Sequence, residues 1–448
     1  MSFENRILLN WINDISSVPK EGKRWPIIDV DERLVNDYKE YIDVASKWGF
    51  NGFTIWGLFI SHSWPVPLEQ CMSKERIKFI NEIIDYAHKR DMKVLSGLGV
   101  YSWGFEELIR KYPNLKASDK KRIWSNESDN NEAMCFYKEE AREWMRKIID
   151  FMLTTVDIDG FGMQAGDLGR CICGKCNVMG DGEYYSEVSY DTASYIKEKY
   201  PDKFLSVSGW GMSFANEADI PYFKKMSSKL DYIADVTESS NEATGYRKKL
   251  IDQLKCNFGT VGGVVVVPPH TWDRLRWWLP HLKINGSNIK DVARDGGKAM
   301  EYFTGVLSNP SDEVTLKAVG YMMNELECSY ITAMEAAVDD TFKPINQKVC
   351  TDIAELMLRS EDAYFENMPL GRYGEFDFES LFAVNSEDAT RYLADKSEEQ
   401  LLSYMREIES ISIDMENLLP YMNETVKANN SIIAMGNVKK DIEFSLKK

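Results

Sequence analysis

The sequence predicts an α/β fold of the TIM-barrel type, a (β/α)8 barrel, followed by a helical C-terminal domain. Strand-like and helix-like segments alternate from the N-terminus to about residue 330, and several strand-like segments are wholly apolar. Continuous apolar strands are typical of a parallel sheet that is covered on both faces. An open doubly wound sheet is the runner-up, but the chain has no G-x-G-x-x-G after its first strand and no P-loop. We place the barrel in residues 1–335 and the helical domain in residues 336–448.

The predicted strands are short and alternate with the helical patterns. The first strand is either Arg6–Leu9 or Trp25–Val30, which the pattern does not separate. The later strands are bounded by glycine or polar residues, as strands usually are. They are Gly52–Leu58, Lys93–Val100, Asp159–Gln164, Phe204–Gly209, Tyr232–Thr237, Gly263–Val267 and Ala299–Thr304.

The predicted helices follow from apolar residues three and four positions apart and from capping residues. Asp31 is an N-cap for a helix that runs to Trp48, and Ser73 is an N-cap for one that reaches Arg90. Short helices are expected around residues 275–295. The remaining barrel helices are Tyr137–Thr155, Val188–Lys199, Asp219–Ser228, Asn241–Lys255 and Thr315–Cys328.

From about Thr341 the pattern becomes helical throughout. The segments Ile345–Asn367, Ser386–Leu393 and Ser397–Leu419 have acidic faces and apolar stripes. An apolar stripe needs a surface to cover it. We therefore expect this domain to pack on the barrel or to pair with a second copy, which would give a homodimer.

The charge and the N-terminus limit the classes of partner. The formal net charge is -17, which argues against nucleic acid or an anionic membrane as a partner. The first residues have no basic start with an apolar run, and no later apolar run has the length of a membrane span. Eight cysteines without an export signal suggest reduced thiols. We expect a cytoplasmic protein without membrane contact.

Aromatic and polar side chains gather at the predicted strand ends. In a parallel barrel the functional groups come from the C-terminal ends of the strands. A single tryptophan there is more often part of the core, but five strand ends carry Trp or Tyr, and aromatic rings stack on the faces of sugars. This pattern predicts a carbohydrate substrate. The candidate substrate-binding residues are Trp56, His62, Tyr101, Trp103, Gln164, Arg170, Trp210, Asp235, His270 and Trp272.

Two acids have the positions that glycoside cleavage requires. Asp167 follows the fourth strand and Glu238 follows the sixth, so both are expected over the same end of the barrel. One carboxyl would protonate the leaving oxygen, and the other would act as the base toward water. The seventh strand ends without an acid until Asp273, which favours inversion over a retaining nucleophile on that strand. Asp235 and Asp273 are the next candidates.

The stretch D-G-F-G-M-Q-A-G-D-L-G-R-C-I-C-G-K-C, Asp159 to Cys176, resembles a loop of glycoside-hydrolase barrels related to bacterial α-glucuronidases and β-N-acetylhexosaminidases. The sequence Met134-Cys135-Phe136 is similar to the cysteine-proline turn of those proteins, with Phe136 in place of proline. The resemblance implies a barrel fold and glycosidase activity. β-Hexosaminidases pair two acids at the end of the fourth strand, whereas this chain has Gly166-Asp167. That departure puts substrate-assisted hexosaminidase chemistry in doubt.

The cysteines after the fourth strand form a C-x-C-x-x-C pattern. Cys171, Cys173 and Cys176 offer three soft ligands, and Cys135 is the natural fourth for a tetrahedral structural zinc. Reduced thiols that only pack remain an alternative, as do a catalytic role and an Fe–S role. With four histidines in the chain, a catalytic zinc held by several imidazoles is disfavoured. We expect no cofactor for catalysis.

Together these patterns predict a glycoside hydrolase with a two-carboxylate mechanism. It would be exo-acting on small oligosaccharides or glycosides. Two alternatives stay open: a sugar-binding barrel without catalysis, and a metal-dependent isomerase or lyase on the same fold. The isomerase would need a His/Glu/Asp cluster around an open metal position, and the sequence shows no such spacing.

Overall fold

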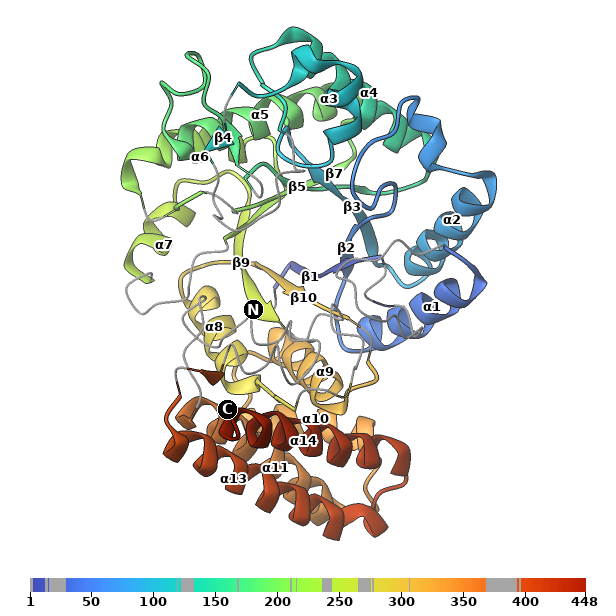
Figure 1. The fold of residues 1–448 in the computed structure, drawn as a ribbon, viewed down its shortest axis with the longest axis vertical. Coiled ribbons are helices and arrows are strands. Elements are labelled where there is room, and N and C mark those ends of the chain that lie inside the picture. The colour runs from blue at the N-terminus through green and yellow to red at the C-terminus, as the bar shows by residue number, and fades with distance from the viewer. Residues whose placement is uncertain are drawn as a thin grey trace.

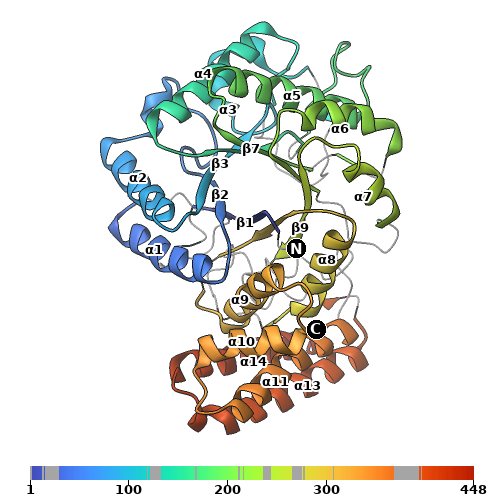
Figure 2. The same cartoon turned by 180° about the vertical axis from the view of Figure 1, so that it is seen from behind.

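The fold is a closed barrel with a helical domain packed against helices on one side of it (Figures 1 and 2). The computed structural model describes residues 3–12, 15, 30–118, 120–121, 133–166, 169–209, 212–214, 216–235, 244–264, 275, 278–305, 307–367, 393–394 and 396–448. Eight parallel strands close the barrel in the order β1-β10-β9-β8-β7-β5-β3-β2. The predicted (β/α)8 fold is therefore confirmed.

The barrel strands agree with the prediction except for one. The first strand is β1, so the alternative at Arg6–Leu9 is confirmed. The strand predicted at Gly263–Val267 begins six residues earlier, at Asn257. The strands are β1 Asn5–Trp11, β2 Gly52–Trp56, β3 Lys93–Gly99, β5 Gly160–Gln164, β7 Phe204–Ser208, β8 Tyr232–Asp235, β9 Asn257–Val264 and β10 Ala299–Phe303.

The barrel helices lie outside the strands (Figure 1). Asp31 caps α1 by accepting a hydrogen bond from Leu34 N at 2.9 Å, as predicted from the sequence. One continuous helix, α8, replaces the short helices expected around 275–295. The helices are α1 Glu32–Lys47, α2 Lys74–His88, α3 Glu106–Lys111, α4 Glu139–Thr155, α5 Asp181–Lys199, α6 Ile220–Ser227, α7 Thr244–Ile251, α8 Leu282–Arg294 and α9 Pro310–Asn324.

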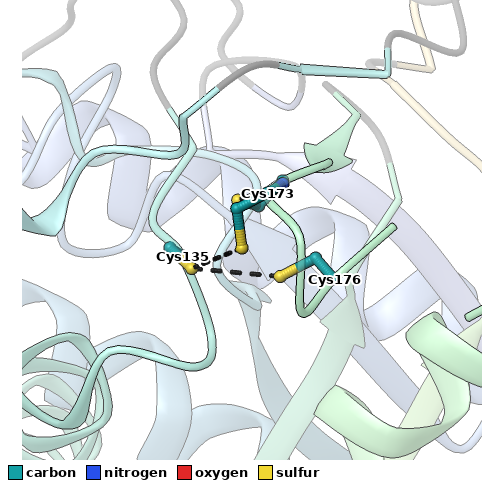
Figure 3. Close-up of side chains that lie close together, drawn as sticks. Cys135, Cys173 and Cys176 are labelled. Carbon is teal, nitrogen blue, oxygen red and sulfur yellow. Dashed lines mark hydrogen bonds between the residues drawn. The ribbon is translucent and has the colours of Figure 1, made fainter. Parts of the chain in front are cut away.

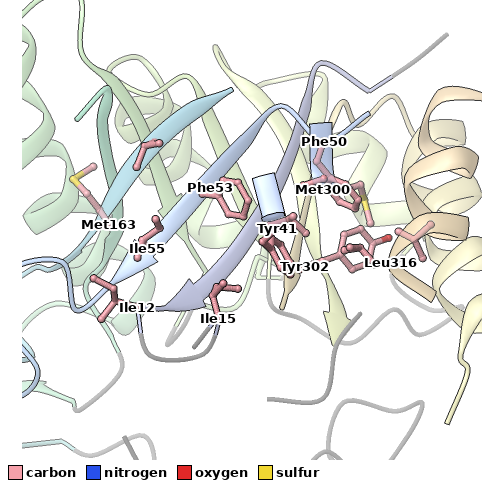
Figure 4. Close-up of a cluster of buried hydrophobic side chains, with 14 of the residues drawn as sticks. Ile12, Ile15, Tyr41, Phe50, Phe53, Ile55, Met163, Met300, Tyr302 and Leu316 are labelled. Atoms are coloured by element: carbon pink, nitrogen blue, oxygen red, sulfur yellow. The ribbon is translucent and has the colours of Figure 1, made fainter. Parts of the chain in front are cut away.

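Side chains alternate between the inside of the barrel and the helices, because neighbours in a strand point to opposite faces. Ile7, Tyr232, Ala234 and Ala299 form a small apolar cluster inside the barrel. The residues between them pack outward, where Phe53 and Ile55 of β2 join the main core under the helices (Figure 4). This alternation decides which strand residues can face a ligand.

The helical domain contains α10 Tyr330–Phe342, α11 Gln347–Asn367, α13 Glu398–Leu418 and α14 Thr425–Leu446. The predicted helix Ser386–Leu393 lies, apart from its last residue, outside the described residues. Nearly every residue of the barrel helix α9 is buried, because α9 contacts α8 of the barrel and α10 and α14 of the helical domain. The helical domain therefore packs on the barrel, which is the first of the two predicted arrangements, and pairing with a second copy stays a prediction.

Polar contacts also join the two parts. The carboxylate of Glu361 on α11 accepts hydrogen bonds from Lys283 N at 2.9 Å and Ile284 N at 3.0 Å, which caps the first turn of α8. In a second contact, Lys317 Nζ pairs with Glu313 at 2.7 Å and with Asp340 at 2.8 Å, while Lys427 of α14 reaches Glu313 at 2.5 Å. Among the described residues, no helix is both long and apolar enough to cross a membrane.

Candidate active site and metal centre

Three tryptophans meet at the C-terminal end of the barrel. Trp11 ends β1, Trp56 ends β2, and Trp103 lies in the segment after β3. The ring centroids are 5.9 Å apart for Trp11 and Trp56, 5.3 Å for Trp11 and Trp103, and 5.7 Å for Trp56 and Trp103. Contacts of this kind hold aromatic rings in fixed orientations. We call these three residues the tryptophan cluster.

The local sequence explains this packing. Trp11 and Trp56 are register partners on neighbouring strands, so both point into the barrel mouth. Gly97 of β3 lies under the indole of Trp56, and a Cβ at that position would overlap the ring. Trp56 is 9% exposed, whereas Trp11 and Trp103 are half-buried. The cluster therefore keeps part of its aromatic surface uncovered by the described residues.

The sequence prediction included Trp56 and Trp103 among the strand-end residues but did not include Trp11. The reason is that the first strand had two candidate positions, so its C-terminal end was not defined. Once β1 is known to end at Trp11, the same strand-end rule selects it.

Gln164, Tyr101 and His62 are also brought to this end of the barrel, in different environments. Gln164 ends β5, is half-buried, and pairs in register with Gly99, which places it on the inner face. Tyr101 is buried and packs edge-on against Phe136 at 5.3 Å. His62 is exposed on the segment after β2. Gln164 therefore has the position that most resembles a ligand contact.

Two other candidates occupy structural positions. Asp235 ends β8 and is fully buried, and its alternation with Ala234 places it on the outer side of the barrel wall. Arg170 is 4% exposed, and its guanidinium donates to Asp181 at 2.8 Å and to two backbone carbonyls of the cysteine loop at 2.9 Å. These contacts hold the loop in place. Asp167, Trp210, Glu238, His270 and Trp272 lie outside the described residues.

One acid inside the barrel was not among the sequence candidates. Glu301 of β10 is 4% exposed and accepts a hydrogen bond from the Tyr232 hydroxyl of β8. Burial raises the pKa of Glu301 to about 7, against a smaller opposing effect of the Tyr232 hydrogen bond. Burial, and then the Glu301 carboxylate, raises the pKa of Tyr232. The signal in the sequence that could have identified Glu301 is that it is the one acid in the otherwise apolar strand Ala299–Phe303.

The four predicted cysteine ligands lie together in one group, and Figure 3 shows three of them, Cys135, Cys173 and Cys176. The Cys135 sulfur lies 3.8 Å from that of Cys173 and 3.9 Å from that of Cys176, and all four sulfurs lie within 4.8 Å of one another. Four thiolates around one Zn²⁺, each at ~2.3 Å, have sulfurs about 3.8 Å apart. The cluster therefore could bind a metal.

Two chain segments assemble this centre. Cys171 ends the short strand β6 (Arg170–Cys171), which pairs antiparallel with β4 (Lys120–Lys121) from the segment between β3 and α4. Cys135 lies at the end of that segment, where its N–H donates to Leu115 O at 3.0 Å. The long segment before α4 thus brings Cys135 across to the other three thiols.

Hydrogen bonds among the thiols shift their pKa values in opposite directions. Hydrogen bonds from Cys135 and then Cys176 lower the pKa of Cys171. The hydrogen bonds with Cys135 and Cys171 raise the pKa of Cys176. Because metal binding requires thiolates, the lowered pKa of Cys171 favours it and the raised pKa of Cys176 opposes it. All eight cysteines of the chain are free of disulfides.

Comparison with known proteins gives a likeness of fold. No family model matches the sequence, and no curated protein matches it significantly. A mutant of the Thermobaculum terrenum O-GlcNAc hydrolase has a TM-score of 0.52 and 9% identity, over 99% of this chain and 87% of that one. A protein named CpGH84B has a TM-score of 0.52 and 11% identity, over 98% of this chain and 67% of that one.

At such identity the likeness defines the class only as a (β/α)8 barrel with a helical region, over almost the whole chain. The resemblance of the loop Asp159–Cys176 to glycoside hydrolases stays a prediction.

Proposed function

We propose that the chain is an exo-acting glycoside hydrolase on small oligosaccharides or glycosides in the cytoplasm. The observation that carries the proposal is the tryptophan cluster at the C-terminal end of a closed parallel barrel. Active sites of (β/α)8 enzymes lie at this end, and uncovered indole faces suit the apolar faces of sugar rings. A shared fold with a named O-GlcNAc hydrolase adds support by analogy.

The proposed chemistry uses Asp167 as the general acid and Glu238 as the general base toward water. Asp167 follows β5 by three residues and Glu238 follows β8 by three residues. Only β7 separates these two strands in the barrel. An inverting pair would have its carboxyl groups roughly 6.5–9.5 Å apart, which leaves room for the attacking water. Trp56, Trp103 and Gln164 are the described residues that we propose as sugar contacts, and Trp11 joins them.

The test is hydrolysis of a panel of chromogenic glycosides by three variants. Asp167→Asn and Glu238→Gln keep side-chain shape but lose acid–base function, so each should lower the rate at least ~10²-fold. Asp202→Asn is the control, because this exposed acid precedes β7 at the opposite end of the barrel. Near wild-type hydrolysis by both site variants would overturn the assignment. Sugar binding without any hydrolysis would support the binding-protein alternative instead.

We also propose that the four cysteines hold a structural zinc. The sulfur separations of 3.8 and 3.9 Å match a tetrahedral all-thiolate site. Four protein ligands leave no open position, so zinc here would stabilise the loops rather than activate water. Within the described residues this is the one group of three or more metal-ligating side chains.

Metal analysis tests the zinc proposal directly. The purified protein should carry about one equivalent of zinc, and Cys173→Ser should lose both the metal and thermal stability. Cys256→Ser is the matched control, because this half-buried thiol lies outside the cluster. Freshly prepared protein with no metal and four reactive thiols at these positions would refute a zinc centre. Iron in place of zinc would refute the choice of zinc and support a metal centre of another kind.

A further inference from the structure

The metal centre and the tryptophan cluster are connected by direct contacts. Cys135 lies between Met134 and Phe136, and both of these neighbours touch Tyr101. Met134 N donates to Tyr101 O at 2.8 Å, and the Phe136 ring packs edge-on against the Tyr101 ring at 5.3 Å. Tyr101 is 2% exposed. The backbone that carries one metal ligand is therefore fixed to the segment that follows β3.

The backbone conformation of Tyr101 sets the path of the chain to Trp103. Its φ of +61° is in the left-handed region, which is costly for a residue with a side chain and persists only where the surroundings impose it. Two residues later, Trp103 makes its edge contacts with Trp11 and Trp56. A turn imposed by its neighbours is sensitive to their position. Movement of the segment around Cys135 would therefore displace Trp103.

The other three ligands lie in the segment that follows β5, the strand next to β3 in the barrel. Cys171, Cys173 and Cys176 follow β5, and Arg170 fixes their loop to the start of α5 through Asp181. Val100 N also donates to Gln164 O at 2.9 Å, which joins the ends of β3 and β5. One ion would therefore link the segment after β3 to the segment after β5.

We propose that occupation of the four-cysteine centre positions Trp103, so that metal binding and the geometry of the tryptophan cluster are thermodynamically coupled. The inference rests on the proposed zinc site and the proposed sugar-binding mouth. Coupling is reciprocal: a change at Trp103 must alter zinc affinity by the same free energy by which zinc alters Trp103. Trp103 has no sulfur or other ligand atom for the metal. An effect of its substitution on zinc affinity would have to travel through Tyr101.

The first measurement is zinc affinity by competition with a chromophoric chelator, on the full chain. Trp103→Ala should weaken zinc binding at least ~5-fold, the lower end of typical coupling between sites. Trp48→Ala is the control, because Trp48 follows α1 and contacts Asp340 of the helical domain. Equal zinc affinity in Trp103→Ala and wild type would overturn the inference. A tryptophan-to-alanine change that only destabilises the fold also lowers zinc affinity where zinc binding is coupled to folding. An equal loss of zinc affinity in Trp48→Ala would therefore overturn the inference as well.

The second measurement is amide hydrogen exchange with and without zinc. Removal of zinc should speed exchange at Val100 and Met134 as well as in the loop Cys171–Cys176, while α11 stays unchanged. Faster exchange confined to Cys171–Cys176 would refute the positioning role and leave a local structural zinc. Absence of zinc from the wild-type protein would instead refute the metal proposal itself, so the two failures are distinguishable.

Discussion

Replacement of Glu301 by glutamine should make the stability of the barrel less dependent on pH. The carboxyl is 4% exposed, and burial raises its pKa from 4.5 to about 7. Because the folded protein binds this proton more tightly than the unfolded chain does, the neutral acid favours the folded state. Its stabilising contribution is complete below pH 4.5 and is lost as the pH rises through 7.

The size of the effect follows from the same two pKa values. Moving the pKa from 4.5 to about 7 corresponds to ~3 kcal/mol between the protonated and the ionised form. Glutamine resembles the protonated acid and can still accept the hydrogen bond from Tyr232. Glu301→Gln should therefore match the wild type near pH 4.5 and exceed its free energy of unfolding by up to ~3 kcal/mol at pH 8.

The assay is urea unfolding of both proteins from pH 5 to pH 8 at constant ionic strength. Subtracting the two curves cancels every other titrating group, including the buried Glu361. Tyr232→Phe is a second arm: it removes the hydrogen bond that lowers the pKa of Glu301, so the loss of stability should extend to higher pH. A difference between wild type and Glu301→Gln that stays constant with pH would refute this reasoning.

Three further predictions concern packing. Glu361→Ala should cost ~1–3 kcal/mol of unfolding free energy, because two part-buried N–H groups of α8 lose their buried acceptor. The neighbouring exposed Asp362→Ala should change the unfolding free energy by less than ~1 kcal/mol, and chemical denaturation of both variants checks this. Gly97→Ala should displace Trp56 and destabilise the barrel by ~1–3 kcal/mol, measured in the same way, and an unchanged stability would contradict the packing of that indole. Deleting the chain after Phe342 should uncover the apolar faces of α9 and α10 or break a homodimer. Sedimentation velocity should then show aggregates or a smaller assembly. A monodisperse, fully active truncation of unchanged assembly state would count against packing and against dimerisation by the helical domain.

The elements that the sequence predicts well are those whose local signals agree with their surroundings. Asp31 caps α1 as expected, and the apolar segment Gly52–Leu58 becomes β2 because both of its faces are covered. The strand β9 was misplaced because Gly259 and Asn257 give its first half no apolar signal. A Cβ at Gly259 would overlap the backbone of Ala299, so the sheet itself requires a residue without a side chain there. Such a requirement comes from a neighbouring strand and is invisible in local sequence.

In the candidate site too, local sequence predicts some residues, whereas others depend on contacts between distant segments. The C-x-C-x-x-C spacing indicated three metal ligands, whereas the approach of Cys135 depends on the pairing of β4 with β6. Trp56 and Trp103 were found from strand ends. Trp11 required knowledge of where β1 ends, and Glu301 required knowledge of which face of β10 points inward. Contacts between distant segments therefore account for most of what the sequence left open.

Glu301 also sharpens the assignment of the catalytic acid. The leaving oxygen of a glycoside requires a carboxyl with a raised pKa, and burial raises the pKa of Glu301 to about 7. It does not meet the geometric one, because it lies two residues before the end of β10, about 6–7 Å below the strand end. A general acid must lie within hydrogen-bond reach of the oxygen that it protonates. Our proposal therefore keeps Asp167 as the acid and expects Glu301→Gln to retain hydrolysis that Asp167→Asn loses. If Glu301→Gln instead loses hydrolysis and Asp167→Asn retains it, Glu301 would be the general acid and the reaction would take place inside the barrel.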